Sequence, residues 1–237
     1  MRLRVLSYNI HKCIGRDRKY QPQRIAETIA HYAPDIVLLQ EVDEGAVRSR
    51  HERQVDVLGD LLGMEHRAFA CNVTLRSGGG YGNAVLSRWP IATSANVDLT
   101  VPLKKRRSVL YAALHLPQHR ALHVFNAHLG LAQYERKQQL VKILNTAEMR
   151  ELEGPVPVIC GGDFNDVYGN LRVQLIPAGF VTVAKPPRSF PSGLPLRALD
   201  SIYVRGRAEL AAFARGDTEL AKIASDHRPV YADVDLL

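Results

Sequence analysis

The stretch Pro155-Val-Pro-Val-Ile-Cys-Gly-Gly-Asp-Phe-Asn165 combines a strand pattern with a polar end. Its β-branched residues lie between prolines and a pair of glycines, which is typical of a buried strand that ends in a tight turn. Residues two apart in an extended chain point to the same side, so we expect Asp163 and Asn165 to face one ligand while Phe164 faces inward. A carboxylate beside an amide suits a hard cation or a phosphate. An ordinary turn that caps a core strand could carry the same residues.

The size and composition fit one globular domain. The 237 residues, 46% of them hydrophobic, can build one substantial core, and we expect a single domain spanning residues 1–237. No run of about 18 apolar residues and no signal-peptide pattern occurs, so we expect a complete cytoplasmic protein without a transmembrane segment. Cys13, Cys71 and Cys160 are scattered and odd in number, which argues against a disulfide framework or a zinc site. We expect all of them to be small core residues.

The net charge of +7 favours an anionic partner, which could be nucleic acid, a phosphorylated metabolite or an acidic lipid surface. The charge alone does not choose among these. The one dense basic cluster is Lys104-Lys-Arg-Arg107, and a solvated entry to a strand would explain it equally well. No segment indicates a protein partner.

The first forty residues predict a strand, a helix and a second strand. A strand pattern over residues 2–10 is followed by helical spacing after Pro22, which Pro34 ends, and by an apolar strand over residues 35–41. In such a crossover unit the carboxyl ends of the two strands lie close together, so Asn9 should lie near Glu41.

The rest of the chain predicts short strands interrupted by a few helices. Strands are expected over residues 65–71, 83–87, 91–99, 108–116, 122–128, 199–204 with a partner at 210–215, and 230–236; helices are expected over residues 55–62, 133–152 and 170–176. This pattern indicates a layered α/β architecture.

Polar residues recur where these strands end. They are Asn9, Glu41, His128, Asp163 with Asn165, Asp200, and Asp226 with His227. Each alone has an ordinary structural explanation, such as a turn former or a satisfied core histidine. Together they can converge on one edge of a sheet, where open α/β sheets tend to bind ligands.

Seven segments carry a resemblance to a known family. They are Val5-Leu-Ser-Tyr-Asn-Ile10, Asp35-Ile-Val-Leu-Leu-Gln-Glu41, Gly82-Asn-Ala-Val-Leu-Ser-Arg88, Phe125-Asn-Ala-His-Leu129, Gly162-Asp-Phe-Asn165, Leu199-Asp-Ser-Ile-Tyr203 and Ser225-Asp-His-Arg-Pro229. In this order they resemble the endonuclease/exonuclease/phosphatase superfamily, whose fold is shared by DNase I, exonuclease III, inositol-polyphosphate 5-phosphatases and neutral sphingomyelinases. The chain is most similar to compact bacterial members, and more similar to the sphingomyelinase-like branch than to the DNA-repair enzymes.

The resemblance implies an α/β fold, a four-layer α/β/β/α sandwich of two mixed sheets similar to DNase I, and a phosphoesterase site that uses Mg²⁺ or Mn²⁺. It implies that Asn9, Glu41 and Asp226 bind the metal and that Asp163, Asn165, His128, Asp200 and His227 are catalytic. His11, Arg88 and Arg107 are weaker candidates for contacts with substrate. Mg²⁺ fits such a set because it prefers oxygen ligands and keeps several waters.

Three functions remain open at this point. The first is a metal-dependent phosphodiesterase, nuclease-like, in which water attacks in line on nucleic acid or a phospholipid head group. The second is a phosphomonoesterase that acts on a small phosphorylated metabolite or an inositol phosphate. The third is a non-catalytic binding module, which the complete set of polar residues disfavours.

Overall fold

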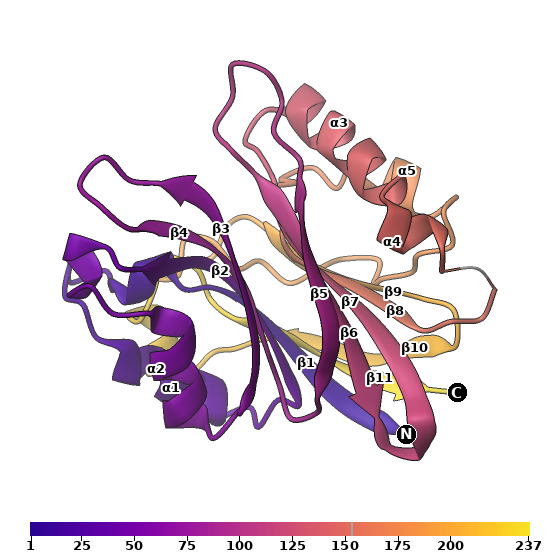
Figure 1. Ribbon diagram of the computed structural model, residues 1–237, viewed down its shortest axis with the longest axis horizontal. Helices are drawn as coiled ribbons and strands as arrows, with labels where there is room; N and C mark the ends of the chain where they lie inside the picture. The colour runs from indigo at the N-terminus through magenta and orange to yellow at the C-terminus, as the bar shows by residue number, and fades with distance from the viewer. Residues whose placement is uncertain (153) are drawn as a thin grey trace.

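The computed structural model describes residues 1–152 and 154–237, and it shows two β-sheets packed face to face with helices on both outer surfaces (Figure 1). Both chain termini lie together at one end of the sheets (Figure 1). The predicted four-layer α/β sandwich is therefore confirmed.

The first sheet comprises β1 (Arg2–Asn9), β2 (Ile36–Glu44), β3 (His66–Thr74), β4 (Gly80–Ser87), β10 (Ala208–Arg215) and β11 (Val230–Leu236). The second sheet comprises β5 (Ile91–Asp98), β6 (Ser108–Leu116), β7 (Arg120–His128), β8 (Val158–Asp163) and β9 (Asp200–Arg205). The helices are α1 (Pro22–Ala30), α2 (Gln54–Leu62), α3 (Gln133–Leu144), α4 (Ala147–Arg150) and α5 (Arg172–Leu175), with short 3₁₀ segments η1 (His11–Cys13), η2 (Val47–Ser49), η3 (Pro117–His119) and η4 (Leu220–Lys222).

The strand order is β10-β11-β1-β2-β4-β3 in the first sheet and β5-β6-β7-β8-β9 in the second. β1 pairs in parallel with β2, and β7 pairs in parallel with β8, whereas the other neighbours are antiparallel. Each sheet is therefore mixed, and each contributes one pair of parallel strands whose carboxyl ends lie next to each other.

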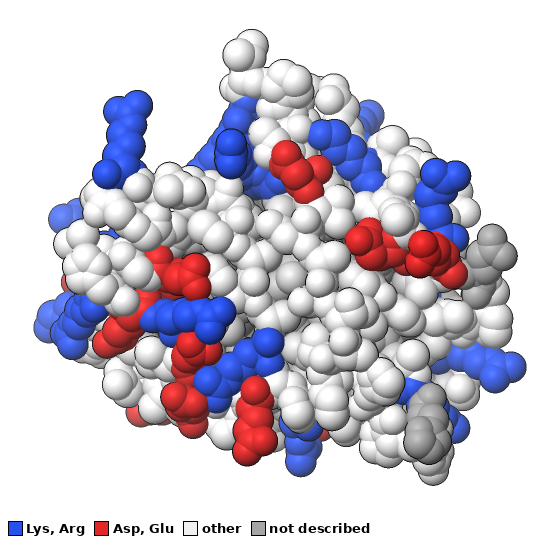
Figure 2. Space-filling view, viewed as in Figure 1, with Lys and Arg blue, Asp and Glu red and all other residues white. Residues whose placement is uncertain are grey.

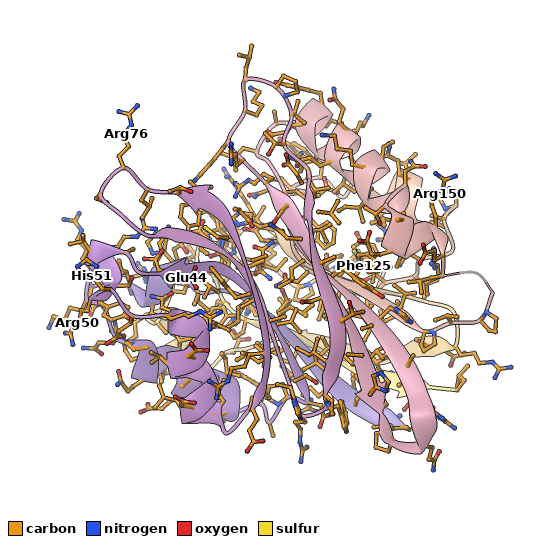
Figure 3. The ribbon with its side chains drawn as sticks, viewed as in Figure 1. Glu44, Arg50, His51, Arg76, Phe125 and Arg150 are labelled. Atoms are coloured by element: carbon orange, nitrogen blue, oxygen red, sulfur yellow. The ribbon has the colours of Figure 1, made fainter. Side chains whose placement is uncertain are left out.

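The side chains of β1 point alternately to the two faces of the first sheet, so they pack in two different layers of the sandwich. Leu3 and Val5 belong to the core between the sheets, whereas Leu6 and Tyr8 pack beneath α1 and α2. On the other side of the molecule, α3 and α4 cover the second sheet, and Phe125 of β7 lies in the interior beneath them (Figure 3). The elements β1, α1 and β2 confirm the strand, helix and strand predicted for the first forty residues.

The carboxyl ends of both parallel pairs meet at the end of the sandwich away from the chain termini (Figure 1). His128 and Asp163 are register partners at the ends of β7 and β8. β1 lies against β8 across the sandwich, so Asn9 comes close to the same point. The fold therefore places polar strand ends from both sheets at one site.

The structure corrects three details of the sequence interpretation. The helix expected over residues 133–152 is two helices, because Thr146 accepts a hydrogen bond from the Met149 amide and starts α4. The strand over residues 210–215 does not pair with β9; the chain turns at Gly206 and crosses to the first sheet, where β10 pairs with β11. Cys71 is exposed on β3, whereas the other two cysteines are buried.

Within the described residues, no helix is long and apolar enough to cross a membrane.

Candidate active site

A buried hydrogen bond joins the two sheets at the end of β1 and β8. The Asn9 Nδ2 donates to Asp163 Oδ2 at 3.0 Å, and the other oxygen of Asp163 accepts from the backbone N–H of Asn165 at 3.0 Å. His128 Nε2 lies 3.5 Å from Asp163 Oδ2. Three of the predicted site residues therefore surround the carboxylate of Asp163, which is almost fully buried.

Backbone geometry explains the glycines before Asp163. Gly162 has a φ of 141°, and a Cβ there would lie 1.9 Å from the Ala127 carbonyl oxygen on β7. Only glycine lets β8 approach β7 this closely in that conformation. Asn165 follows with a φ of 52°, and its side chain donates to the Leu129 carbonyl at 3.0 Å. The tight turn predicted after β8 thus fixes the direction of both polar side chains.

His227 is held between two carboxylates. Its Nδ1 lies 2.9 Å from Asp200 Oδ2, which also accepts a short hydrogen bond from the Ser189 hydroxyl, and its Nε2 lies 3.8 Å from Asp163 Oδ2. The ring of Phe190 packs against the imidazole, with 4.9 Å between the centroids. Ligand atoms of Asp163, Asp200 and His227 all lie within 4.8 Å of one another.

These contacts change the pKa values of both partners. Burial alone would lower the pKa of His227, but the facing carboxylates of Asp200 and Asp163 raise it to about 10. Burial raises the pKa of Asp163 to about 7, against the opposing effect of the His227 charge. The imidazole therefore keeps its proton near neutral pH, while Asp163 is poised to exchange one.

Glu41 lies at a bulge in β2, where the register with β4 shifts between Gln40 and Val42. Its φ of 58° is unusual for a residue with a side chain and turns the carboxylate out of the strand pattern. Burial raises the pKa of this carboxyl, but nearby positive charge, including that of Lys12, lowers it by more, to about 2. Glu41 therefore stays ionised.

The surroundings of Glu41 fit a cation. Its Oε2 is buried and accepts no well-aligned hydrogen bond from the described residues, and the ammonium of Lys12 rests against it as a counter-ion. Asp226 is half-buried, and its charge contributes to the raised pKa of His227. The carboxylates of Glu41 and Asp226 and the amide oxygen of Asn9 are donors of the kind that Mg²⁺ prefers, so each of them suits a divalent ion.

The three weaker candidates lie in different places. His11 is close enough to Glu41 to lower its pKa, and its Nδ1 lies 2.9 Å from the Ile14 carbonyl oxygen. Arg107 is buried and lowers the pKa of His128, so it belongs to the site. Arg88 does not: it pairs with Asp35 at 2.8 Å where β2 begins, at the other end of the strand from Glu41. The expectation that Arg88 contacts substrate is corrected.

Sequence reasoning missed Lys12 and Ser189. Lys12 lies in η1, where three successive residues adopt left-handed φ values of 45°, 59° and 58°, and no residue type in that turn signals this conformation. Ser189 lies in a loop and reaches Asp200 only through the fold. An oriented histidine usually has such a second polar neighbour, but sequence spacing cannot identify it.

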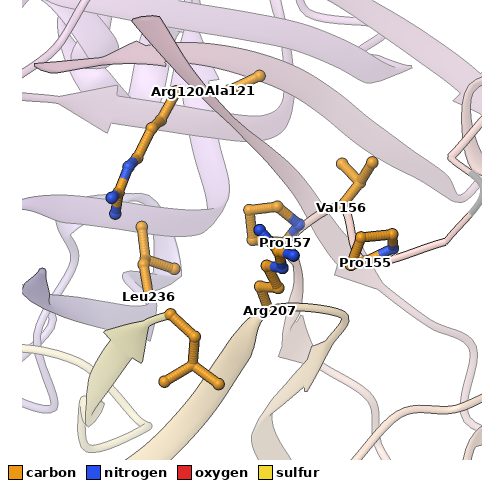
Figure 4. Close-up of a pocket in the computed structure, with 8 residues that line it drawn as sticks. Arg120, Ala121, Pro155, Val156, Pro157, Arg207 and Leu236 are labelled. Atoms are coloured by element: carbon orange, nitrogen blue, oxygen red, sulfur yellow. The ribbon is translucent and has the colours of Figure 1, made fainter. Parts of the chain in front are cut away.

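Two cavities lie near the ends of the sandwich. One of about 290 Å³ lies beside Asp166 and the buried Phe164, and residues 184–186 form part of its wall. The other, of about 310 Å³, is lined by Arg120, Arg207 and the segment from 155 to 157, where β7 and β8 begin (Figure 4). That second cavity is at the end opposite His128 and Asp163, so it is separate from the candidate site.

The chain is similar to proteins of one family along almost its whole length. Residues 6–227 match the profile of the Endonuclease/Exonuclease/phosphatase family. The uncharacterized protein YbhP of Escherichia coli K12 is 32% identical over 249 aligned positions, which cover 98% of this chain and 96% of YbhP.

Solved structures of this family have a similar fold. An endonuclease/exonuclease/phosphatase from Beutenbergia cavernae has a TM-score of 0.82 and 25% identity, covering 99% of this chain and 72% of that one. The structure of D. rerio TDP2 complexed with a single-strand DNA product has a TM-score of 0.72 and 19% identity over 99% of both chains, a likeness of fold alone. The chain therefore belongs to the Endonuclease/Exonuclease/phosphatase family.

Proposed function

We propose that this protein is a metal-dependent phosphoesterase that hydrolyses a phosphodiester bond by in-line attack of water. The observation that carries the proposal is the buried cluster of Asp163, Asp200 and His227, whose ligand atoms lie within 4.8 Å of one another at strand ends. Buried groups whose pKa values are perturbed by desolvation and by a specific charge partner are candidates for a functional site. Membership of the family supports the same reaction class.

Glu41, Asn9 and Asp226 would hold Mg²⁺ or Mn²⁺. When bound, such an ion neutralises charge on a phosphate oxygen and assists departure of the leaving group. The ammonium of Lys12 forms a salt bridge with Glu41. When an ion binds to Glu41, this ammonium must either contact the carboxylate together with the ion or move away from it.

Other residues of the site donate hydrogen bonds to the phosphate and accept the proton of the attacking water. Protonated His227, oriented by Asp200, donates to a non-bridging oxygen where negative charge accumulates in the transition state. Asp163 accepts the proton of the attacking water, since its pKa of about 7 allows it to be ionised at neutral pH. Asn165 and neutral His128 supply further donors. Burial lowers the pKa of His128 well below its usual value, with the charge of Arg107 acting in the same direction.

Two residues would contact the substrate beside this centre. Arg107 is 7% exposed and its Nε has no hydrogen-bond partner among the described residues, so a phosphate oxygen would complete its contacts. His11 lies next to Glu41 and could donate to the same group. These positions suit nucleic acid or a phospholipid head group, and the charge of +7 favours a polyanion.

A phosphomonoester of a small metabolite or an inositol phosphate is the second candidate. The buried Nε of Arg107, which has no hydrogen-bond partner among the described residues, favours it, because a terminal phosphate carries more negative charge than a diester. A panel of monoester and diester substrates separates the two candidate functions.

The test is hydrolysis by EDTA-treated protein to which Mg²⁺ or Mn²⁺ is returned. Substrates are bis-p-nitrophenyl phosphate, p-nitrophenyl phosphate, plasmid and single-stranded DNA, RNA, sphingomyelin, cardiolipin and inositol phosphates. We expect metal-dependent turnover of at least one diester that exceeds turnover of the monoester.

Glu41→Gln supplies the matched variant. It should lose metal-dependent turnover by about two orders of magnitude or more, because an amide replaces the ionised ligand. Glu44→Gln, on the same strand but partly exposed and paired with Arg53, should keep it. Equal activity of both variants, or turnover that EDTA does not affect, would refute the proposal.

A further inference from the structure

Three cations from separate segments surround one buried tyrosine ring. Lys105 Nζ lies 5.2 Å from the ring centroid of Tyr81, Arg48 Cζ lies 5.3 Å from it, and Lys12 Nζ lies 5.9 Å from it. Lys12 comes from the turn after β1, Arg48 from the segment after β2, and Lys105 from the loop between β5 and β6. Because these residues are far apart in the sequence, only the fold brings their charges together.

This group, which we call the Tyr81 cluster, lies directly beside the candidate active site. Lys12 contacts Glu41, and Lys105 lowers the pKa of His128. Figure 2 shows Lys and Arg side chains in the hollow between the β3–β4 hairpin, from whose tip Arg76 projects in Figure 3, and the β5–β6 loop. An anion bound here would therefore adjoin the group that is being hydrolysed.

The cluster has more positive charge than its own carboxylates neutralise. Arg48 makes two hydrogen bonds to buried Asp43, and Lys12 has Glu41. Lys105 has no carboxylate partner in the described part of the chain, and its side chain is exposed, so its ammonium can contact an anion beside the Tyr81 ring. The buried Nε of Arg107, two residues later, also has no hydrogen-bond partner there. Three cations of the cluster thus face two carboxylates, and the excess positive charge favours a bound anion.

We propose that Lys12, Arg48 and Lys105 around Tyr81 form a second phosphate-binding subsite, and that the substrate carries a second phosphate group next to the one that is cleaved. This inference rests on the proposed function, because it treats Asp163 and His227 as the cleavage site. Tyr81 is 6% exposed, so its ring orients the cations and does not offer a surface for stacking a base.

The chain offers a matched control within the same loop. Lys104 is adjacent to Lys105, but its ammonium lies 5.3 Å from the centroid of Tyr134, at the start of α3, and so points to a different aromatic ring. Lys104→Ala and Lys105→Ala remove the same charge from the same exposed loop. A general effect of net charge would be equal in both variants, whereas loss of the subsite affects only Lys105→Ala.

The kinetic test uses substrates that differ by one phosphate. The p-nitrophenyl ester of thymidine 5′-phosphate is compared with the same ester bearing a 3′-phosphate. A second arm compares glycerophosphoglycerol with bis(glycerophospho)glycerol, and tells a nucleotide source of the second phosphate from a lipid head group.

We expect the second phosphate to raise kcat/KM of the natural protein by about ten- to a hundredfold in one arm, the range of charge-assisted hydrogen bonds. Lys105→Ala should reduce this ratio to near one, and Lys104→Ala should keep it. A ratio near one in the natural protein, or equal ratios in the two variants, would overturn the subsite.

A binding measurement separates failure of the subsite from failure of the proposed function. Isothermal titration of EDTA-treated protein compares thymidine 3′,5′-bisphosphate with thymidine 5′-phosphate, and bis(glycerophospho)glycerol with glycerophosphoglycerol. Preference for the second phosphate in either pair that Lys105→Ala loses supports the subsite even if no ester is hydrolysed. No preference in either pair contradicts the subsite even if diesters are hydrolysed.

Discussion

At the scale of single residues, the position of His227 between Asp200 and Asp163 determines its proposed role. The three side chains come from two strand ends and a loop, and all are buried, so water does not screen their charges. Two facing carboxylates raise the pKa of the imidazole to about 10 despite its burial. Removing one carboxylate should therefore change both the charge and the orientation of the ring.

Asp200→Asn tests this directly. We expect kcat to fall by about two to four orders of magnitude, because the imidazole loses the charge that keeps it protonated and in position. The imidazole pKa, followed by NMR in the metal-free protein, should fall as well. Asp60→Asn, which changes an exposed carboxylate on α2, is the control. Unchanged kcat in Asp200→Asn would remove His227 from its proposed role.

Residue types at strand ends were predictable, whereas their contacts were not. The motif segments indicated that Asn9, Glu41, Asp163 and His227 would meet, because each ends a strand or follows a turn. The sequence did not indicate that Lys12 rests on Glu41, since a left-handed turn of ordinary residues places it there. Arg88 was wrongly expected at the site. Its motif follows β4, which runs antiparallel to β2, so Arg88 lies at the opposite end of these strands from Glu41.

At the scale of elements, the site depends on the close approach of β7 and β8. Gly162 permits it, since any side chain at this position would meet the backbone of Ala127. Two predictions about elements were wrong: the single helix over residues 133–152, and the pairing of residues 210–215 with β9. Both depended on tertiary contacts. A capping threonine and a sheet crossing at Gly206 depend on packing that periodicity does not contain.

Gly162→Ala should lower the free energy of unfolding by about 2–4 kcal/mol, because it combines an unfavourable φ with backbone overlap. Gly63→Ala has a similar positive φ of 62° but open space around it, so we expect a cost of only about 1 kcal/mol. Denaturant titration of both variants provides the comparison. Equal costs would mean that the contact between β7 and β8 does not constrain residue 162.

At the scale of the whole molecule, both sheets share one core. Residues such as Val5 and Leu38 from the first sheet and Val124 and Ile159 from the second belong to the same buried cluster. The active-site residues also come from both sheets, and the Asn9–Asp163 hydrogen bond joins them. Separation of the sheets would therefore disassemble the site.

We predict that the chain unfolds as one cooperative unit. Trp89, the single tryptophan, packs against the core between the sheets, so its fluorescence reports on their contact, whereas far-UV circular dichroism reports on all strands and helices. The two guanidinium transitions should coincide. Transitions that separate would show that the sheets behave as independent units.

On the proposed function, oxygen donors from distant parts of the chain hold one divalent ion where both sheets end. Anomalous diffraction from crystals soaked in Mn²⁺ measures this directly. We predict a manganese peak about 2–2.5 Å from a carboxylate oxygen of Glu41, absent from crystals of Glu41→Gln. A peak that lies away from Glu41, or that persists unchanged in Glu41→Gln, would contradict the proposed metal site.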